Sequence, residues 1–255
     1  MSIQRILPAL PRISLLPRTA GGRAVEIRKG LPRLFRLGWS VFCAAAGLLS
    51  SGVPASAASP SFDCRKASSR SEKMICANSQ LATLDQQISV RYKALLAQLG
   101  GSAAEQLKRD QQWFITGRDD SYTEAPTVRE LADTLRYRLA FLNAVRPSVP
   151  VGIVGTWRNV AGAIVIRRSP SGTLTFEANA AEPTTGRWVC EAQGSAKPAA
   201  QSTWKVAIDD PDTASITLTR EGPLLTVTES PMPPEYCGLN GSLSGAYFPV
   251  ADEAP

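Results

Sequence analysis

Cysteine is the residue type in this sequence with the clearest potential for chemistry. The chain of 255 residues has five cysteines and no histidine. Four cysteines, Cys64, Cys76, Cys190 and Cys237, lie beyond the N-terminal region, and none of them is part of a C-x-x-C pair. This pattern argues against a zinc site. The absence of histidine also removes the commonest general base and any Ser-His or Cys-His nucleophile pair, so we predict a protein without catalytic activity or cofactor.

Carboxylates are the remaining candidates for acid–base or metal chemistry. The densest cluster is Asp209, Asp210 and Asp212 in the stretch DDPD. Asp-Pro-Asp between two strand-like segments is typical of a turn, and we favour that interpretation over a metal or catalytic site. Asp119 and Asp120 are expected to form a solvated helix end, where Asp119 can pair with the arginine that precedes it.

The first 57 residues have the composition of a secretory signal peptide. They hold eight basic residues against one acidic residue, followed by the apolar run LGWSVFCAAAGLLSSGV and a small-residue site, ASA, that ends at Ala57. These features are the n-region, h-region and cleavage site of an exported protein. The uninterrupted apolar core is shorter than the roughly 20 residues that span a bilayer. We predict cleavage after Ala57, a periplasmic or secreted protein, and no stable membrane span.

Removal of residues 1–57 would change the charge of the chain. The full sequence carries a net charge of +6, whereas the remaining residues hold 20 basic and 21 acidic side chains. A net charge of −1 gives no reason to expect nucleic acid as a partner.

In an oxidising compartment the four remaining cysteines indicate disulfides. Pairing of Cys64 with Cys76 and of Cys190 with Cys237 would close loops of about 13 and 48 residues, worth ~3 and ~4 kcal/mol in the chain-entropy model. We favour this pairing, because a small domain gains most from such a staple. Crossed pairing, which would tie the two halves of the chain together, stays open as the alternative.

Residues 58–146 show the punctuation of helices. Three stretches have the form of a capping box, namely 69–72 (SRSE), 102–105 (SAAE) and 127–130 (TVRE), and Ser79 is a fourth candidate cap. Apolar residues then recur at steps of three and four, as Leu81, Leu84, Ile88, Tyr92, Leu95 and Leu99, and again as Val128, Leu131, Leu135, Leu139 and Leu142. This spacing predicts a small antiparallel helical domain, with the first long helix stopped by two glycines and a middle helix that ends near Gly117.

From residue 147 the period of the sequence changes to two. Residues 147–152 are a turn-rich linker. Residues 153–250 contain seven short runs of β-branched and aromatic residues separated by Gly, Pro, Asn and Asp, namely GTWRNV, AIVIRR, TLTFEAN, GRWVCEA (residues 186–192), TWKVAI, SITLTR and LLTVTE. This texture is typical of an antiparallel barrel or sandwich, and a closed barrel of seven or eight strands is the first choice. The predicted class is therefore α+β with two domains. Trp157, Trp188 and Trp204, one in each of three runs, are expected to fill the barrel core.

The helical half resembles the bacterial LprI family, named after a lysozyme inhibitor, at its N-terminal domain. The family pattern DC…A….E..IC….LA.LD……Y is matched here by Asp63, Cys64, Ala67, Glu72, Ile75, Cys76, Leu81, Ala82, Leu84, Asp85 and Tyr92. The pattern continues with Gln111, Arg118 and Asp119, while Phe114 stands where the family has tryptophan. Arg138 and Leu142 match the closing residues of the family only loosely, and a second cysteine pair that the family carries before the last helix is missing.

The resemblance implies an exported, non-enzymatic helical domain, followed here by an additional β domain. It also implies a lysozyme, or another protein active on cell walls, as partner. Lysozymes of animal secretions are basic, so a binding surface should be acidic. Residues 63–146 have a net charge of +3 and residues 147–255 one of −4, so we expect the acidic loops of the barrel, DDPD and ESPMPPEY, to contribute more to binding than the helices.

The alternative is a module that binds the cell envelope without inhibiting an enzyme. Basic residues gather around the first cysteine pair, namely Arg65, Lys66, Arg70 and Lys73. They could meet carboxylates of peptidoglycan or phosphates of lipids, although a solvated charged face is the simpler interpretation.

Overall fold

The computed structural model describes five segments of the chain, residues 59–120, 126–148, 152–209, 215–230 and 234–251. The expected signal peptide, residues 1–57, lies outside them. The described segments fall in one compact unit, Pro54–Pro255. Within them, α-helices precede a closed antiparallel barrel, so the predicted α+β class is confirmed.

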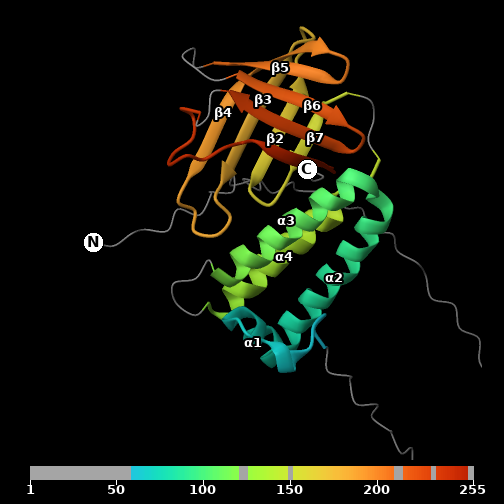
Figure 1. The fold of residues 1–255 in the computed structure, drawn as a ribbon, viewed down its shortest axis with the longest axis vertical. Helices are drawn as coiled ribbons and strands as arrows, with labels where there is room; N and C mark the ends of the chain where they lie inside the picture. The colour runs from blue at the N-terminus through green and yellow to red at the C-terminus, as the bar shows by residue number, and fades with distance from the viewer. Residues whose placement is uncertain (1–58, 121–125, 149–151, 210–214, 231–233, 252–255) are drawn as a thin grey trace, which may run out of the picture. The chain divides into compact units, whose positions relative to one another are not determined.

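A short 3₁₀ turn and four α-helices come first in the described segments (Figure 1). They are η1 (Cys64–Lys66), α1 (Arg70–Ala77), α2 (Ser79–Leu99), α3 (Gly101–Asp120) and α4 (Val128–Ala144). The predicted apolar stripes face the core: Leu81 and Leu95 of α2 are fully buried, and so are Leu131 and Leu135 of α4. Val128 is the exception and stays 41% exposed at the start of α4.

Two of the four predicted helix caps are confirmed. Ser69 and Thr127 each accept the amide of the glutamate three residues later, and that glutamate accepts the amide of the cap in return. Such reciprocal bonds satisfy N–H groups that have no partner inside a helix. Helices α1 and α4 therefore begin where the sequence predicts.

The predicted cap at Ser79 is wrong by one residue. The side-chain oxygen of Asn78 accepts the amides of Gln80 and Leu81, at 3.0 and 3.1 Å. Ser79 is already the first residue of α2. Both side chains can cap a helix, and the extended backbone of Asn78, with φ −132° and ψ 116°, gives the position to asparagine.

The middle helix, α3, is longer than predicted at both ends. Gly100 and Gly101 adopt positive φ angles of 63° and 45°, so the chain turns within two residues and α3 begins directly after α2. The amide of Ala104 already donates to the carbonyl of Gly100. The predicted capping box at Ser102 is therefore wrong, because that residue lies inside the helix, which continues to Asp120.

Eight antiparallel strands form the barrel (Figure 1). They are β1 (Gly155–Arg158), β2 (Gly162–Arg168), β3 (Leu174–Ala181), β4 (Val189–Ala200), β5 (Thr203–Ile208), β6 (Ser215–Glu221), β7 (Leu224–Ser230) and β8 (Gly245–Val250). Each strand pairs with the next in the chain, and β8 pairs with β1 to close the ring. The preferred closed barrel is confirmed. The run of residues that forms β8 was not among the seven predicted runs.

Strand β4 extends well beyond its predicted run of residues 186–192. It continues through Gly194 and Pro198, two residue types that interrupt strands, and its pairing with β5 shifts register between Pro198 and Ala200. Any Cβ at position 194 would lie 2.1 Å from the carbonyl oxygen of Ala207. Glycine thus allows a close approach of β4 and β5, which a local propensity argument cannot anticipate.

Strand β8 is buried on both faces. Tyr247 points into the barrel core, while Phe248 and Val250 belong to the core cluster formed by the helices. The rings of Phe248 and Phe141 of α4 meet edge to face with centroids 6.4 Å apart. Helices and barrel therefore share one core cluster along β8, and the division of this unit into two domains stays a prediction.

The end of α4 is also joined to β8 through the backbone. Val145 and Val250 form an isolated antiparallel bridge. The amide of Arg146 donates to the carbonyl of Pro249 at 2.9 Å, and the amide of Ala251 donates to that of Ala144 at 2.8 Å. A search of the described residues finds no helix with the length and hydrophobicity to cross a membrane.

Candidate functional site

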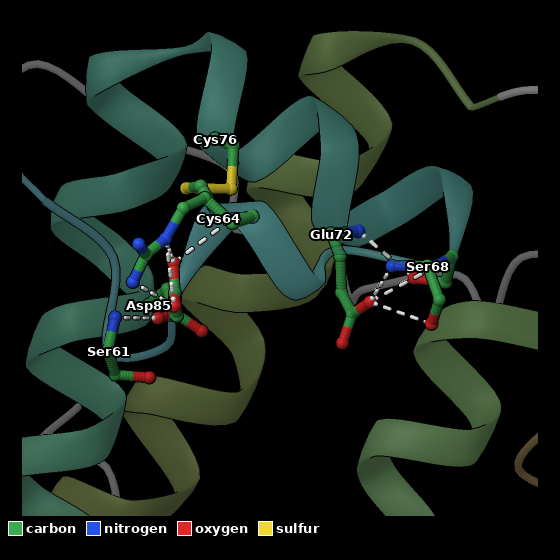
Figure 2. Close-up of a disulfide and its surroundings, with 9 residues drawn as sticks. Ser61, Cys64, Ser68, Glu72, Cys76 and Asp85 are labelled. Atoms are coloured by element: carbon green, nitrogen blue, oxygen red, sulfur yellow. Dashed lines mark hydrogen bonds and ion pairs between the residues drawn. A yellow bond between two sulfur atoms is a disulfide. The ribbon is translucent and has the colours of Figure 1, made fainter.

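The Cys64–Cys76 disulfide fastens the segment before α1 to that helix (Figure 2). The two Cα atoms are 5.8 Å apart and the cysteines 12 positions apart. Asp63 caps η1 by accepting the amide of Arg65, and the guanidinium of Arg65 lowers the pKa of Asp63. The Arg65 side chain is 90% exposed, so this ion pair adds little stability. The cysteine pair is a structural staple.

Two carboxylates of the family pattern hold the same region in place. Asp85 of α2 accepts the amide of Ser61 at 2.6 Å (Figure 2). Glu72 accepts the amide of Ser68 at 2.7 Å in addition to its capping box. The bond from Ser68 lowers the pKa of Glu72 more than burial raises it. Both carboxylates are therefore engaged in local structure.

Arg118 and Asp119 pair at the end of α3, as the sequence predicts. Arg118 Nε lies 2.7 Å from Asp119 Oδ1, and the two side chains are only 6% and 18% exposed. The carbonyl of Arg118 also accepts a hydrogen bond from the Ser71 hydroxyl at 3.0 Å. The expectation of a solvated helix end is wrong for Asp119, since α1 packs against this turn, and holds for Asp120, which is exposed.

A buried ion pair joins α3, α4 and the barrel. Asp110 accepts a hydrogen bond from Arg138 Nη1 at 2.5 Å, and its second oxygen accepts the amide of Val160, between β1 and β2, at 2.7 Å. Gln111 Oε1 accepts two further bonds from Arg138, at 3.0 and 2.8 Å. Asp110 and Arg138 are 7% and 2% exposed. Asp110 was not among the predicted candidates, because its partners lie 28 and 50 positions away in the sequence.

Two aromatic rings complete the surroundings of Arg138. Its guanidinium carbon lies 5.1 Å from the ring centre of Phe114 and 4.9 Å from that of Phe141. Phe114, at the position where the family pattern has tryptophan, is thus a cation–π partner of Arg138. Ile75 is fully buried in the helical core, and Leu84 and Tyr92 pack against that core. The family positions in this part of the chain serve capping, ion pairing and core formation.

The second disulfide lies at one end of the barrel. Cys190 of β4 and Cys237 form an antiparallel bridge, with 47 positions between them and Cα atoms 4.1 Å apart. The amide of Glu191 donates to the carbonyl of Tyr236 at 3.2 Å. We call residues 234–244, which precede β8, the barrel-end segment. Backbone hydrogen bonds and the disulfide together fasten this segment to residues 189–191 of β4, a stretch that does not pair with β5.

Glu229 of β7 holds the rest of the barrel-end segment. Its carboxylate accepts hydrogen bonds from the hydroxyls of Tyr236, Ser242 and Ser244 and from the amides of Leu243 and Ser244. Burial alone would raise the pKa of Glu229, but these hydrogen bonds outweigh it and lower the pKa. Burial and the bond to Glu229 raise the pKa of Tyr236. All five groups donate to Glu229, so the arrangement requires an ionised carboxylate. This role of Glu229 was not predicted from the sequence.

Replacing Glu229 with glutamine is expected to lower the free energy of unfolding by about 1.5–3 kcal/mol at pH 7, the range for hydrogen bonds to a charged group. The folded-state pKa of Glu229 lies below its ordinary value of 4.5, so its contribution is complete above that pH and is lost as the pH falls through the folded-state pKa. Urea unfolding of both proteins between pH 7 and pH 3 should show the difference shrinking toward acid. Glu235→Gln, an exposed residue of the same segment, is the control and should change little.

The remaining sequence predictions concern three tryptophans, expected in the barrel core, and the acidic turn DDPD. Trp157 is 2% exposed in the barrel core, and Trp188 and Trp204 pack against that core partly buried, which confirms their expected place. The DDPD turn lies outside the described residues except for Asp209. Among the side chains that the structure describes, no group of three or more Cys, Asp and Glu is placed to hold a metal ion.

Comparison with known proteins matches residues 64–168 to the family described as lysozyme inhibitor LprI. No curated protein and no solved structure matches the chain. The match begins at the first cysteine of the disulfide in Figure 2 and extends through β2, beyond residue 146, where the sequence places the end of the helical domain. It therefore includes both sides of the bond between Asp110 and Val160. The resemblance noted in the sequence is confirmed over residues 64–168, which are similar to the LprI family.

Proposed function

We propose that this protein is exported and binds a lysozyme as an inhibitor, occupying the cleft of the enzyme without covalent chemistry. The observation that carries the proposal is the match of residues 64–168 to the lysozyme inhibitor LprI family. The two disulfides support a location outside the cytoplasm, where such bonds persist. The predicted signal peptide, with cleavage after Ala57, supplies the route.

The barrel is the half of the molecule whose charge suits a basic enzyme. Residues 147–255 carry a net charge of −4, whereas residues 63–146, which hold most of the family match, carry +3. Complementary charge speeds association and disfavours wrong partners. The helices would then act mainly as the scaffold that holds β8 and the turn between β1 and β2.

Inhibition is the direct test of this function. Oxidised protein comprising residues 58–255 is expected to slow the clearing of a cell-wall suspension by a hen-type lysozyme, with half-inhibition near or below micromolar concentration, as for specific complexes. Inhibition should be lost after reduction, because both disulfides fasten elements of the fold. The effect should also weaken at high salt, where charge steering is screened.

A folded protein that leaves lysozyme unaffected at micromolar excess would contradict the proposal. The function would then shift to the envelope-binding alternative, for which Arg65, Lys66, Arg70 and Lys73 offer four exposed cations near the first disulfide. Circular dichroism of the sample used in the assay shows whether the protein is folded.

A further inference from the structure

A strained turn projects from the barrel-end segment. The amide of Gly241 donates to the carbonyl of Gly238 at 2.8 Å, and the two central residues, Leu239 and Asn240, have positive φ angles of 47° and 60°. These are the features of a type I′ turn. Asparagine and glycine adopt positive φ readily, but a leucine there is uncommon and costs conformational free energy.

The position of this turn is set by Gly241. An Asn-Gly pair would ordinarily occupy the two central positions of a type I′ turn, which would place the turn one residue later. Gly241 instead lies against the indole of Trp188, where an added Cβ would come within 2.9 Å of two ring carbons. Glycine is needed there for close approach, so the positive φ angles move to Leu239 and Asn240.

Leucine at position 239 gains nothing for the fold that offsets this strain. Its side chain is 75% exposed, the highest value among the large apolar residues of the described chain. Glycine would satisfy the same backbone at lower cost. A residue held in an unfavourable conformation without burial points to a function for its side chain.

The turn is held rigidly. Its first residue, Gly238, donates its amide to the carbonyl of Val189 at 2.9 Å, directly beside the Cys190–Cys237 disulfide. On its other side, Glu229 fixes the residues that follow the turn. A preformed loop loses little conformational entropy on binding, which favours affinity.

The tip has an apolar centre and an acidic surround. Val189, which is 63% exposed, accepts the amide of Gly238 at the base of the turn and adds a second exposed apolar side chain to this part of the barrel. Two exposed carboxylates belong to the same region, Glu191 on β4 and Glu235 in the barrel-end segment. The sequence from 234 to 251 contains no lysine or arginine, and Arg187, two positions before Val189, is an exposed cation of the same region. An apolar tip with an acidic rim complements a concave site on a basic protein.

We infer that the turn Gly238–Gly241 is the element that enters the substrate cleft of the lysozyme, with the Leu239 side chain as its anchor. The inference rests on the proposed function and names the surface that performs it. A projecting turn matches a cleft in shape, and its apolar centre supplies the desolvated contact that carries most binding energy in an interface.

The helical half offers a competing apolar surface. An open groove runs along α2 and α4, lined by Gln86, Val90, Leu139 and Asn143, and Val90 is 60% exposed. The groove belongs to the basic half, whose charge opposes a basic partner. Val90 therefore provides a matched control for the loss of an exposed aliphatic side chain.

The test is Leu239→Gly in the lysozyme-clearing assay. Glycine keeps the turn and removes the anchor, so the variant is expected to raise the concentration for half-inhibition about tenfold or more, while its Tm stays within about 3 °C of the wild type or rises. Leu239→Asn, which also tolerates positive φ, should show the same loss. Leu239→Met should retain inhibition, and so should Val90→Ala.

The outcomes separate this inference from the function on which it rests. Wild-type inhibition together with full inhibition by Leu239→Gly and Leu239→Asn would overturn the role of the turn and leave the proposed function standing. Absence of inhibition by the folded wild type would reject the proposed function, and the docking role with it. Loss of inhibition in both variants with unchanged Tm would establish the turn, since a structural role predicts no such combination.

Discussion

Replacing Asp110 with alanine is expected to lower the free energy of unfolding by about 3–5 kcal/mol, the range observed when one partner of a buried ion pair is removed. The variant would leave Arg138 charged, 2% exposed and without its carboxylate. Gln111 and the two phenylalanine rings would remain around Arg138, but none of them carries a negative charge to balance the guanidinium.

Asp110 should stabilise the barrel as well as α3, because its second oxygen accepts the amide of Val160 in the barrel. Its removal leaves that amide unsatisfied between β1 and β2. We therefore expect a single cooperative unfolding transition at lower denaturant, with helices and barrel destabilised together. Far-ultraviolet circular dichroism reports mainly the helices. Tryptophan fluorescence in a Trp113→Phe background, followed in the same urea titration, reports the barrel, where Trp157, Trp188 and Trp204 lie.

The control is Asp133→Ala in α4. Asp133 pairs with Arg136 at 2.7 Å, but these side chains are 60% and 48% exposed. Such a pair contributes about 0–1 kcal/mol. If the Asp110 and Asp133 variants lose equal stability, the buried pair is not the link between helices and barrel described above.

Removing the Cys190–Cys237 disulfide by a double substitution to alanine is expected to cost about 4 kcal/mol, and removing Cys64–Cys76 about 3 kcal/mol, from the lengths of the loops they close. The bonds span 47 and 12 positions. Alanine suits position 190 because Cys190 is 2% exposed in the barrel core, where serine would bury a hydroxyl.

Guanidinium unfolding of the two double variants against the wild type gives both values. The two double variants should differ more in their inhibition of lysozyme than in their free energy of unfolding. The Cys190 and Cys237 variant releases the barrel-end segment from β4, so its inhibition of lysozyme should fall under conditions where it remains folded. Equal inhibition by both variants would count against a role for that segment.

Local patterns in the sequence were sufficient where the structure depends on local physics. Ser69 and Thr127 cap helices because, where a helix begins, a hydroxyl and a carboxylate three residues apart can each accept the backbone amide of the other residue. Alternation with a period of two indicated strands, and the cysteine spacing favoured the pairs that the structure contains.

The remaining features depend on contacts that no local pattern records. Ser102 has the form of a cap, yet the positive φ angles of Gly100 and Gly101 start the helix before it. Asp110 looks like any polar residue on a helix until Arg138 and Val160 are brought to it. Glu229 likewise sits in an ordinary alternating strand, and its partners come from a segment without regular structure.

Leu239 shows a different limit of sequence reasoning. The pair Asn240-Gly241 signals a turn correctly, but the contact of Gly241 with Trp188 shifts the turn by one residue. Only this shift makes the leucine strained and exposed. A residue that contradicts local preference without any gain in burial becomes visible only after the tertiary contacts are known.

The double attachment of β8 sets the order in which the molecule can be completed. The strand pairs with β1, about 90 residues earlier in the chain, and with the residues after α4, and contacts of such long range form slowly. When the chain emerges from its N-terminus, during synthesis or export, neither the ring of strands nor its seam with the helices can close before β8 has emerged. Until then β1 and β7 present unpaired edges that invite pairing with other chains. Completion of the barrel and of its seam with the helices therefore depends on the arrival of β8.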